Sequence, residues 1–311
     1  MTGRNEPCPC KSGRKFKHCC INKAKIPSSN TGAAQEKRRE KGRNIILKTA
    51  EQIEKMRIAG KFNGELMDYI RPFVRAGIST GEIDRLVYNY TVEHGHVPGT
   101  LNHNKYPKSC CISRNNIVCH GIPKDDEYLL DGDIVNIDLT TNVGGWFGDQ
   151  NETFLIGNVS DHAKNLVMAS FEGAIAAIKG LAPGLPLSII GDIIEPTVNK
   201  RGCSVVRDYT GHGIGSDFHE DPVVSHNKNN ESRNIILKPG MTFTIEPMIN
   251  AGDYKIYTDK KDGWTVYTKD GSLSAQFEHT VLITEFGAEV LTLTPSQKEK
   301  GVIFALPQEI K

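Results

Sequence analysis

Long hydrophobic runs are missing from this sequence. In its 311 residues no apolar stretch approaches the roughly 20 residues that a membrane-spanning helix needs. The N-terminal stretch MTGRNEPCPC also lacks the apolar core of a secretory signal peptide. The sequence therefore predicts a cytoplasmic protein with no membrane partner.

Net charge is nearly absent too, but the value of +1 at pH 7 hides two opposite regions. Residues 1–44 contain 12 Lys or Arg against 3 Asp or Glu, a net charge of +9, and the rest contains 26 against 34, a net charge of −8. A basic tail suggests a polyanionic partner. A solvated tail that only improves solubility is the alternative.

Cysteine is sparse outside the N-terminal region. Four of the eight cysteines are scattered through the body, and the other four form a Cys-x-Cys pair and a Cys-Cys pair around a Ser-Gly turn: Cys8, Cys10, Cys19 and Cys20. Cytosolic thiols stay reduced, so this paired spacing favours a metal over disulfides. Four thiolates can close a tetrahedral zinc site and fold a segment that is too short for a core. Redox-active or idle thiols are the alternative.

Residues 4–20, RNEPCPCKSGRKFKHCC, resemble the SEC-C motif, the small zinc-binding tail of the bacterial preprotein translocase ATPase. Lys11 stands where the motif usually has Gly, and Cys20 stands where His is common, so His18 and Cys20 both remain candidates for the fourth ligand. The resemblance implies one structural zinc in a motif at residues 1–25. Residues 26–45 then read as a flexible basic linker.

The body is organised around residues 134–155, IVNIDLTTNVGGWFGDQNETFL, which predict a β-hairpin. A turn centred between Val143 and Gly144 would place Asp138 directly opposite Asp149, with Cβ atoms roughly 4.5–5.5 Å apart. Two carboxylates in apolar surroundings repel each other unless a cation lies between them. Solvated aspartates on an edge hairpin, or a bulge that separates them, are the alternatives.

Two pairs of amphipathic helices are predicted, one on each side of the hairpin. The first pair begins near Lys48 and at Ser79, which can form a capping box with Glu82; the second begins after Ser160 and after Gly184. This pattern indicates two related halves, although chance periodicity is the alternative. An offset of 107 residues superposes Gly77 on Gly184, Ile83 on Ile190, Leu86 on Ile193, Val87 on Ile194 and Gly95 on Gly202.

Polar residues interrupt the later strands. His212 lies in TGHGIGSDFHEDP, whose glycines predict close backbone approach and unusual dihedral angles. Glu246 ends the apolar strand MTFTIEPM, and Glu278 interrupts the expected strand LSAQFEHTVLI. With Asp138 and Asp149 these residues give four carboxylates and one imidazole. That donor set suits a pair of divalent ions such as Mn, Fe, Co or Zn.

These motifs resemble the methionine aminopeptidase family of the pita-bread fold, and its type I bacterial form in particular. The resemblance covers residues 48–294 and includes YPKSC, VCHGIP, NIDLTTNVGGWFGD, TGHGIGSDFHEDP, TIEPM and FEHT. It implies an α+β fold of two pseudo-symmetric halves, with helices packed on an antiparallel sheet, over residues 46–311. The short spacing from His219 to Glu246 leaves no room for the inserted domain of type II enzymes.

The resemblance also implies roles for individual residues. Glu246 would shuttle a proton, His219 would hydrogen-bond the substrate carbonyl oxygen, and His120 would contact the scissile amide. Thr100 and His103 replace the Cys and Tyr that are usual in the substrate site of bacterial members. The implied metal ligands are Asp138, Asp149, His212, Glu246 and Glu278, of which Asp149 and Glu278 bridge two ions, and the implied methionine pocket is Tyr106, Cys111, Phe218 and Trp264.

The implied function is removal of the initiator methionine from nascent proteins when the second residue is small, by attack of a metal-activated water. The zinc-bearing basic tail would dock a monomeric enzyme on the ribosome. A proline-specific aminopeptidase of the same fold is one alternative, although that family usually has a large N-terminal domain. A non-catalytic binding module at the ribosome is another, although such modules lose metal ligands.

Overall fold

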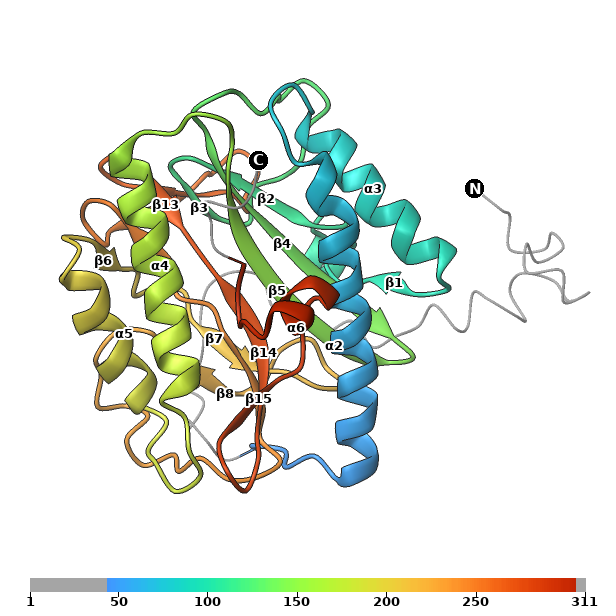
Figure 1. Ribbon diagram of the computed structural model, residues 1–311, viewed down its shortest axis with the longest axis vertical. Helices are drawn as coiled ribbons and strands as arrows, with labels where there is room; N and C mark the ends of the chain where they lie inside the picture. Colours follow the sequence, from blue (N-terminus) through green and yellow to red (C-terminus); the bar gives the residue numbers. More distant parts are fainter. Residues whose placement is uncertain (1–43, 306–311) are drawn as a thin grey trace, which may run out of the picture. The chain divides into compact units, whose positions relative to one another are not determined.

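The computed structural model describes residues 44–305, so the expected zinc motif and nearly all of the expected linker lie outside the described residues. The described chain forms a nine-stranded sheet in the order β1-β4-β5-β14-β9-β7-β8, with β2 beside β4 and β15 beside β14 (Figure 1). All its strand pairs are antiparallel. The strands are β1 (Val97–Pro98), β2 (Cys111–Arg114), β4 (Ile134–Val143), β5 (Trp146–Leu155), β7 (Gly211–Gly213), β8 (Glu220–Val224), β9 (Thr242–Ile245), β14 (Glu278–Ile283) and β15 (Ala288–Val290).

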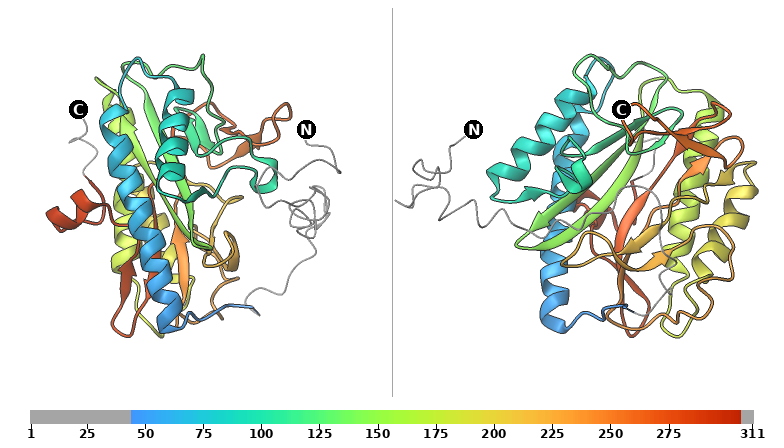
Figure 2. Two further views of the ribbon diagram at one scale, coloured as in Figure 1. Left: turned by 90° about the vertical axis from the view of Figure 1, so that its right-hand side faces the viewer. Right: turned by 180° about the vertical axis from the view of Figure 1, so that it is seen from behind.

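The four predicted helices are present, and the two for which a cap was predicted begin at that cap. Ser79 and Glu82 form the expected capping box, and the Ser160 hydroxyl accepts a hydrogen bond from Ala163 N. Figure 2 shows α2 and α4 on the same side of the sheet. None of the described helices is long and apolar enough to cross a membrane. The helical segments are α2 (Ala50–Ile70), η2 (Arg71–Phe73), α3 (Thr80–Glu93), η3 (His103–Lys105), α4 (Asp161–Lys179), α5 (Ile189–Asn199) and α6 (Pro295–Lys300).

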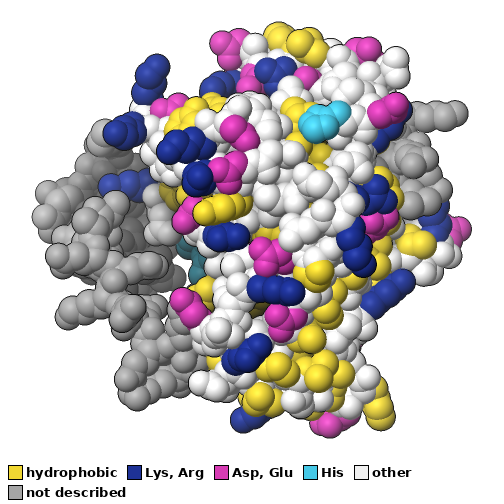
Figure 3. Space-filling view, turned by 90° about the vertical axis from the view of Figure 1, so that its left-hand side faces the viewer, with side chains coloured by type: hydrophobic (Ala, Val, Ile, Leu, Met, Phe, Trp, Pro, Cys, Tyr) yellow, Lys and Arg dark blue, Asp and Glu magenta, His cyan; other side chains and the backbone are white. Residues whose placement is uncertain are grey.

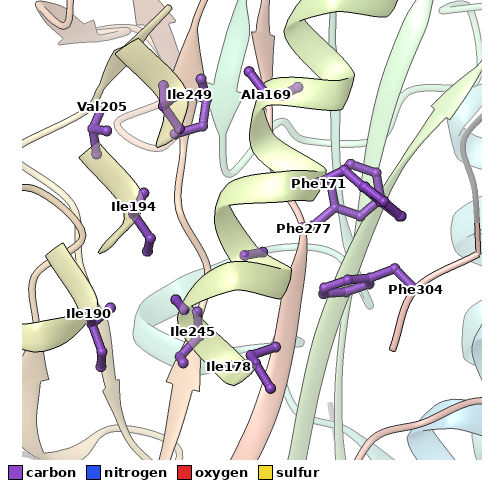
Figure 4. Close-up of a cluster of buried hydrophobic side chains, with 14 of the residues drawn as sticks. Ala169, Phe171, Ile178, Ile190, Ile194, Val205, Ile245, Ile249, Phe277 and Phe304 are labelled. Atoms are coloured by element: carbon purple, nitrogen blue, oxygen red, sulfur yellow. The ribbon is translucent and has the colours of Figure 1, made fainter. Parts of the chain in front are cut away.

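Each helix pair covers its own hydrophobic core. In one half, side chains of α4 and α5 pack on the sheet, with the Phe171, Phe277 and Phe304 rings in mutual contact (Figure 4). In the other half, α2 and α3 bury side chains such as Leu66 and Ile83 against β2, β4 and β5. Burial of these apolar faces stabilises the helices on the sheet and fixes the strands that carry the polar outliers.

The two halves repeat the same backbone hydrogen bonds. Gly77 N donates to Leu129 O at 2.8 Å, and Gly184 N donates to Leu237 O at 2.9 Å. These bonds use the glycine pair that the offset of 107 residues predicted. Both glycines have a positive φ, 89° and 87°, a conformation that favours glycine. The predicted pseudo-symmetry is therefore confirmed.

The central hairpin forms as predicted, but its turn lies one residue further along. Val143 pairs with Trp146, so Gly144 and Gly145 form the two-residue turn, with φ of 60° and 90°. A tight hairpin turn of this kind requires positive φ at both central residues, and two glycines meet that requirement without strain. The expectation of a turn between Val143 and Gly144 was wrong.

The expected continuous strand through Glu278 is interrupted. The backbone N–H of Gln276 donates to the side-chain Thr153 Oγ1 at 3.0 Å, and Gln276 O accepts from Thr153 Oγ1 and Asn136 Nδ2. These side chains replace the strand ladder at this point, so Glu278 begins β14. Two smaller three-stranded sheets complete the described fold: β6 (Ser204–Val205), β10 (Ile249–Asn250) and β13 (Ser274–Ala275), and β3 (Ile117–Cys119), β11 (Ile256–Thr258) and β12 (Val266–Thr268).

Candidate metal and catalytic site

The two hairpin aspartates lie on one face of the sheet, although they are not directly opposite. Asp138 pairs with Asn151 and Asp149 pairs with Thr140, because the turn is shifted. The predicted direct pairing was therefore wrong. The displacement is an even number of residues, however, so both side chains still face the same side. Carboxylate oxygens of Asp138, Asp149 and Glu278 lie within 4.8 Å of one another.

The other two predicted ligands complete the cluster. His212 Nε2 lies 3.6 Å from Asp149 Oδ2 and 3.7 Å from Glu246 Oε1. The five residues belong to five neighbouring strands in sheet order, β4, β5, β14, β9 and β7, with Glu246 directly after β9. The antiparallel sheet therefore gathers residues that are far apart in the sequence.

The glycines around His212 allow the backbones of neighbouring strands to lie close to β7. Gly211, Gly213 and Gly215 all have ordinary φ, so the expectation of unusual dihedral angles was wrong. A Cβ on Gly211 would lie 2.6 Å from Thr244 O, and one on Gly213 would collide with the Asp221 backbone. Strand β7 therefore needs glycine on both sides of His212 to pack between β8 and β9.

Because its carboxylates are buried and carry like charges, this cluster destabilises the folded protein when no cation is bound. Burial, and then the charges of Asp149 and Glu246, raise the pKa of Asp138 well above its usual range. The same causes raise the pKa of Glu278. Asp138 Oδ1 and Glu278 Oε1 are buried and have no hydrogen-bond partner among the described residues. Oxygen donors with one imidazole suit divalent ions, so the residues fit a metal centre.

Glu246 is held at every polar atom by residues that the sequence did not reveal. Thr244 Oγ1 donates to Oε1 at 2.8 Å, and Gln276 Nε2 donates to Oε2 at 3.1 Å. The backbone N–H of Glu246 donates to Nε2 of buried His226 at 3.1 Å. Burial, together with Asp149, raises the pKa of Glu246 to about 7 despite the opposing effect of His212. Glu246 can therefore exchange a proton near neutral pH.

A chain of amides and a hydroxyl orients the hairpin ligands. Asn136 Nδ2 donates to Asn151 Oδ1 at 2.9 Å, and Asn151 Nδ2 donates to Glu278 Oε2 at 2.6 Å. Thr140 Oγ1 donates to Asp149 Oδ1 at 2.9 Å. One sequence signal could have found the β4 residues: Asn136, Asp138 and Thr140 alternate with apolar residues, which marks one polar face, whereas β5 has five consecutive polar residues and gives no such signal.

The predicted catalytic histidines border the cluster. The His219 ring centroid lies 4.2 Å from that of His212. Burial lowers the pKa of His120 to about 4, and partial desolvation together with the neighbouring imidazoles lowers the pKa of His219. His120 has φ of 57°, which is uncommon for a residue with a side chain and typical of functional sites. Both histidines are therefore neutral at pH 7.

The predicted pocket residues form two aromatic groups beside these histidines. Tyr106 packs edge-on against Trp264, with ring centroids 5.2 Å apart, and Trp264 packs against His120. Phe218 stacks on His219 at 4.2 Å and contacts His103 at 4.7 Å. The other two predicted substrate-site residues, Cys111 and Thr100, have no part in these ring contacts. Cys111 pairs with Asp138 across β2 and β4, whereas the Thr100 hydroxyl bonds Lys108 O within its own loop.

Comparisons with known proteins identify the family to which the chain belongs. Metallopeptidase family M24 matches residues 54–285, and the SEC-C motif matches residues 4–22. Methionine aminopeptidase of Escherichia coli (strain K12) is 50% identical over 260 residues, 83% of this chain and 98% of that protein. The crystal structure of methionine aminopeptidase from Rickettsia prowazekii has a TM-score of 0.78 at 44% identity, over 80% of this chain and 100% of that one. Xaa-Pro dipeptidase from Bacillus anthracis, at 21% identity and a TM-score of 0.63 over 80% of this chain and 62% of that one, shares the fold alone.

Proposed function

The chain belongs to metallopeptidase family M24, and we propose how its residues remove the initiator methionine from nascent proteins whose second residue is small. It is a methionyl aminopeptidase with the pita-bread fold, and nascent N-termini are its substrates. The observation that carries the chemistry is the convergence of five metal-binding side chains from five neighbouring strands. The catalytic domain would span residues 46–311, after a zinc motif at 1–25 and a linker at 26–45.

The metal centre would hold two divalent ions, drawn from Co, Mn, Fe and Zn. The unpartnered oxygens of Asp138 and Glu278 support this assignment. When bound, the ions would lower the pKa of a water molecule and polarise the carbonyl of the first peptide bond. The residues that would hold the ions are Asp138, Asp149, His212, Glu246 and Glu278.

Glu246 moves the proton. Its carboxylate takes a proton from the attacking water and passes it to the nitrogen of the leaving amine. Thr244 and Gln276 fix the two carboxylate oxygens while both transfers occur. His219, as a neutral imidazole, donates to the carbonyl oxygen as negative charge grows there, and His120 contacts the scissile amide.

The first side chain of the substrate lies among aromatic residues. An apolar, aromatic lining suits the unbranched thioether of methionine. His103 lines the same site through its contact with Phe218, and Thr100 shapes the loop that presents it. The proposed lining is Tyr106, Cys111, Phe218 and Trp264.

Release of the N-terminal residue from Met-Ala-Ser and from an Ala-Pro peptide tests this function. Chelator-treated enzyme should cleave only Met-Ala-Ser when Mn, Co, Fe or Zn is added back. Cleavage of only the Ala-Pro peptide would indicate the proline-specific alternative, which has the shared fold in its favour. No cleavage with any metal would indicate a binding module.

The tail would place this cytoplasmic, monomeric enzyme at the ribosome. Its net charge of +9 (12 − 3) supports a polyanionic partner. Figure 3 shows acidic and basic side chains interspersed on the pictured face of the body, so that face gives no competing basic patch. One structural zinc would be bound by Cys8, Cys10, Cys19 and either His18 or Cys20.

Deletion of residues 1–44 tests the tail. The shortened enzyme should hydrolyse short peptides normally and lose salt-sensitive binding to ribosomes. Metal analysis of the full chain should find one zinc that is lost when Cys8 and Cys10 are replaced by Ser. Unchanged ribosome binding after the deletion would remove the tail from the proposed function.

A further inference from the structure

A second group of charges is buried outside the metal site. Lys48, just before α2, pairs through Nζ with Glu220 Oε2 at the start of β8, and the two side chains are only 2% and 5% exposed. The backbone N–H of Lys48 also donates to Gly240 O at 2.8 Å. Glu220 Oε1 accepts from Asp217 N at 3.3 Å. This ion pair therefore joins the segment that enters α2 to the turn before β8.

The turn of residues 215–220 lies directly against the ion pair. A Cβ on Gly215 would lie 2.7 Å from Lys48 Nζ and would collide with Glu220 Oε1. Gly215 O accepts a hydrogen bond from Phe147 N at 2.9 Å, which ties the beginning of the turn to β5. The glycine is needed because the backbone passes so close to both charges.

The same turn carries residues of the proposed site. Phe218 stacks on Phe147 with ring centroids 5.5 Å apart, and His219 immediately precedes Glu220. Ser216, Asp217 and His219 are exposed. A turn with exposed residues opens locally at low free energy unless buried contacts hold it. The buried contact at its far end is the pair between Glu220 and Lys48.

We propose that Lys48 is a positioning residue, which fixes the imidazole of His219 by neutralising Glu220 beneath the turn. This proposal rests on the proposed role of His219 at the substrate carbonyl. A hydrogen bond that strengthens as charge develops requires a fixed donor, and a displacement of about 1 Å can reduce the rate on the order of 100-fold. Loss of Lys48 would leave the Glu220 carboxylate buried and unpaired. The turn would then move to expose that charge to water.

Three variants test the proposal. Lys48→Met keeps the length of the side chain and removes its charge, so kcat on Met-Ala-Ser should fall on the order of 10- to 100-fold with little change in KM. Amide hydrogen exchange over residues 215–220 should become faster in the same metal-loaded enzyme. The double variant Lys48→Met with Glu220→Leu buries no charge and should recover most of the rate.

Arg71→Met is the matched control. Arg71 NH1 pairs with buried Glu152 at 2.8 Å, at the other end of α2 and away from the turn. This variant also leaves a buried carboxylate unpaired and should lower thermal stability. It should leave kcat and exchange at residues 215–220 unchanged. A general effect of lost stability would instead lower activity in both variants.

Two results would overturn the proposal: Lys48→Met with kcat within twofold of wild type, or exchange at residues 215–220 that does not change. If instead the proposed role of His219 is wrong, a different variant will show it. If His219→Ala retains full activity, His219 has no part in the reaction, and a rate loss in Lys48→Met would then have to arise elsewhere. The exchange measurement still decides whether Lys48 holds the turn.

Discussion

Asp138→Asn should make the metal-free protein more stable, although it removes a proposed metal ligand. The Asp138 carboxyl has a pKa raised by burial and by the charges of Asp149 and Glu246, and its Oδ1 has no hydrogen-bond partner among the described residues. Asn has nearly the same shape and no charge. The substitution therefore removes like-charge repulsion without creating a cavity.

The size of the effect follows from the pKa shifts. Glu246 shifts from 4.5 to about 7, and about 1.4 kcal/mol per pKa unit gives a cost of roughly 3 kcal/mol for one such carboxylate. A group with a raised pKa binds more protons in the folded protein than in the unfolded chain. Its cost is absent below pH 4.5 and grows as pH rises to about 7. The pKa of Asp138 is raised in the same direction, so we expect Asp138→Asn to stabilise the metal-free protein, and to do so more at pH 8 than at pH 4.5.

Thermal unfolding in chelator measures this gain. For a domain of this size 1 kcal/mol shifts Tm by roughly 2–4 °C. Asp262→Asn is the control, because Asp262 accepts hydrogen bonds from Trp264 N and from Thr265 that lower its pKa, so the loss of its charge should destabilise. Added Mn should stabilise the wild type more than Asp138→Asn. A lower Tm for Asp138→Asn at pH 8 in chelator would refute the reasoning.

Three further substitutions test individual residues. Glu246→Gln can keep the contacts with Thr244 and Gln276 but cannot accept a proton, so kcat should fall at least about 100-fold without any loss of Tm, and normal turnover of metal-replete enzyme would contradict the shuttle. His226→Leu removes the acceptor of Glu246 N–H and should lower kcat about tenfold, with partial recovery in His226→Gln; equal rates for the two variants would exclude this role. Lys105 has φ of 73°, so Lys105→Gly should raise stability by up to about 1 kcal/mol, and a lower Tm would show that the backbone is unstrained.

Local signals in the sequence were sufficient for the helices and for the pseudo-symmetry. Capping residues such as Ser79 act within one turn, and glycines such as Gly77 report a backbone conformation that the chain itself requires. The hairpin register was also a local question, and the prediction failed because it did not require positive φ at both turn residues. The break before Glu278 was different, since it depends on side chains of β4 and β5 that bond Gln276.

The sequence predicts the proposed metal ligands better than it predicts the residues that hydrogen-bond to them. Asp138, Glu246 and Glu278 stand out because each is charged within or at the end of an apolar strand, and family resemblance then gave their roles. Gln276 and His226 are ordinary polar residues until the fold places them beside Glu246, 30 and 20 positions away. The partner of Lys48 lies 172 positions away. Such contacts exist only after the sheet order is known.

The instability of the metal-free cluster and its proposed chemistry both arise from the burial of its carboxylates. Five adjacent strands converge on a buried cluster, and that burial raises the pKa of Glu246 to about 7. The same burial leaves oxygens of Asp138 and Glu278 without partners. Solvation of the cluster would satisfy those oxygens, but it would also return the pKa of Glu246 in the metal-free protein towards its ordinary value. The carboxylates that destabilise the metal-free protein are the same residues that would hold the ions, so the stability gained by Asp138→Asn should come with loss of activity.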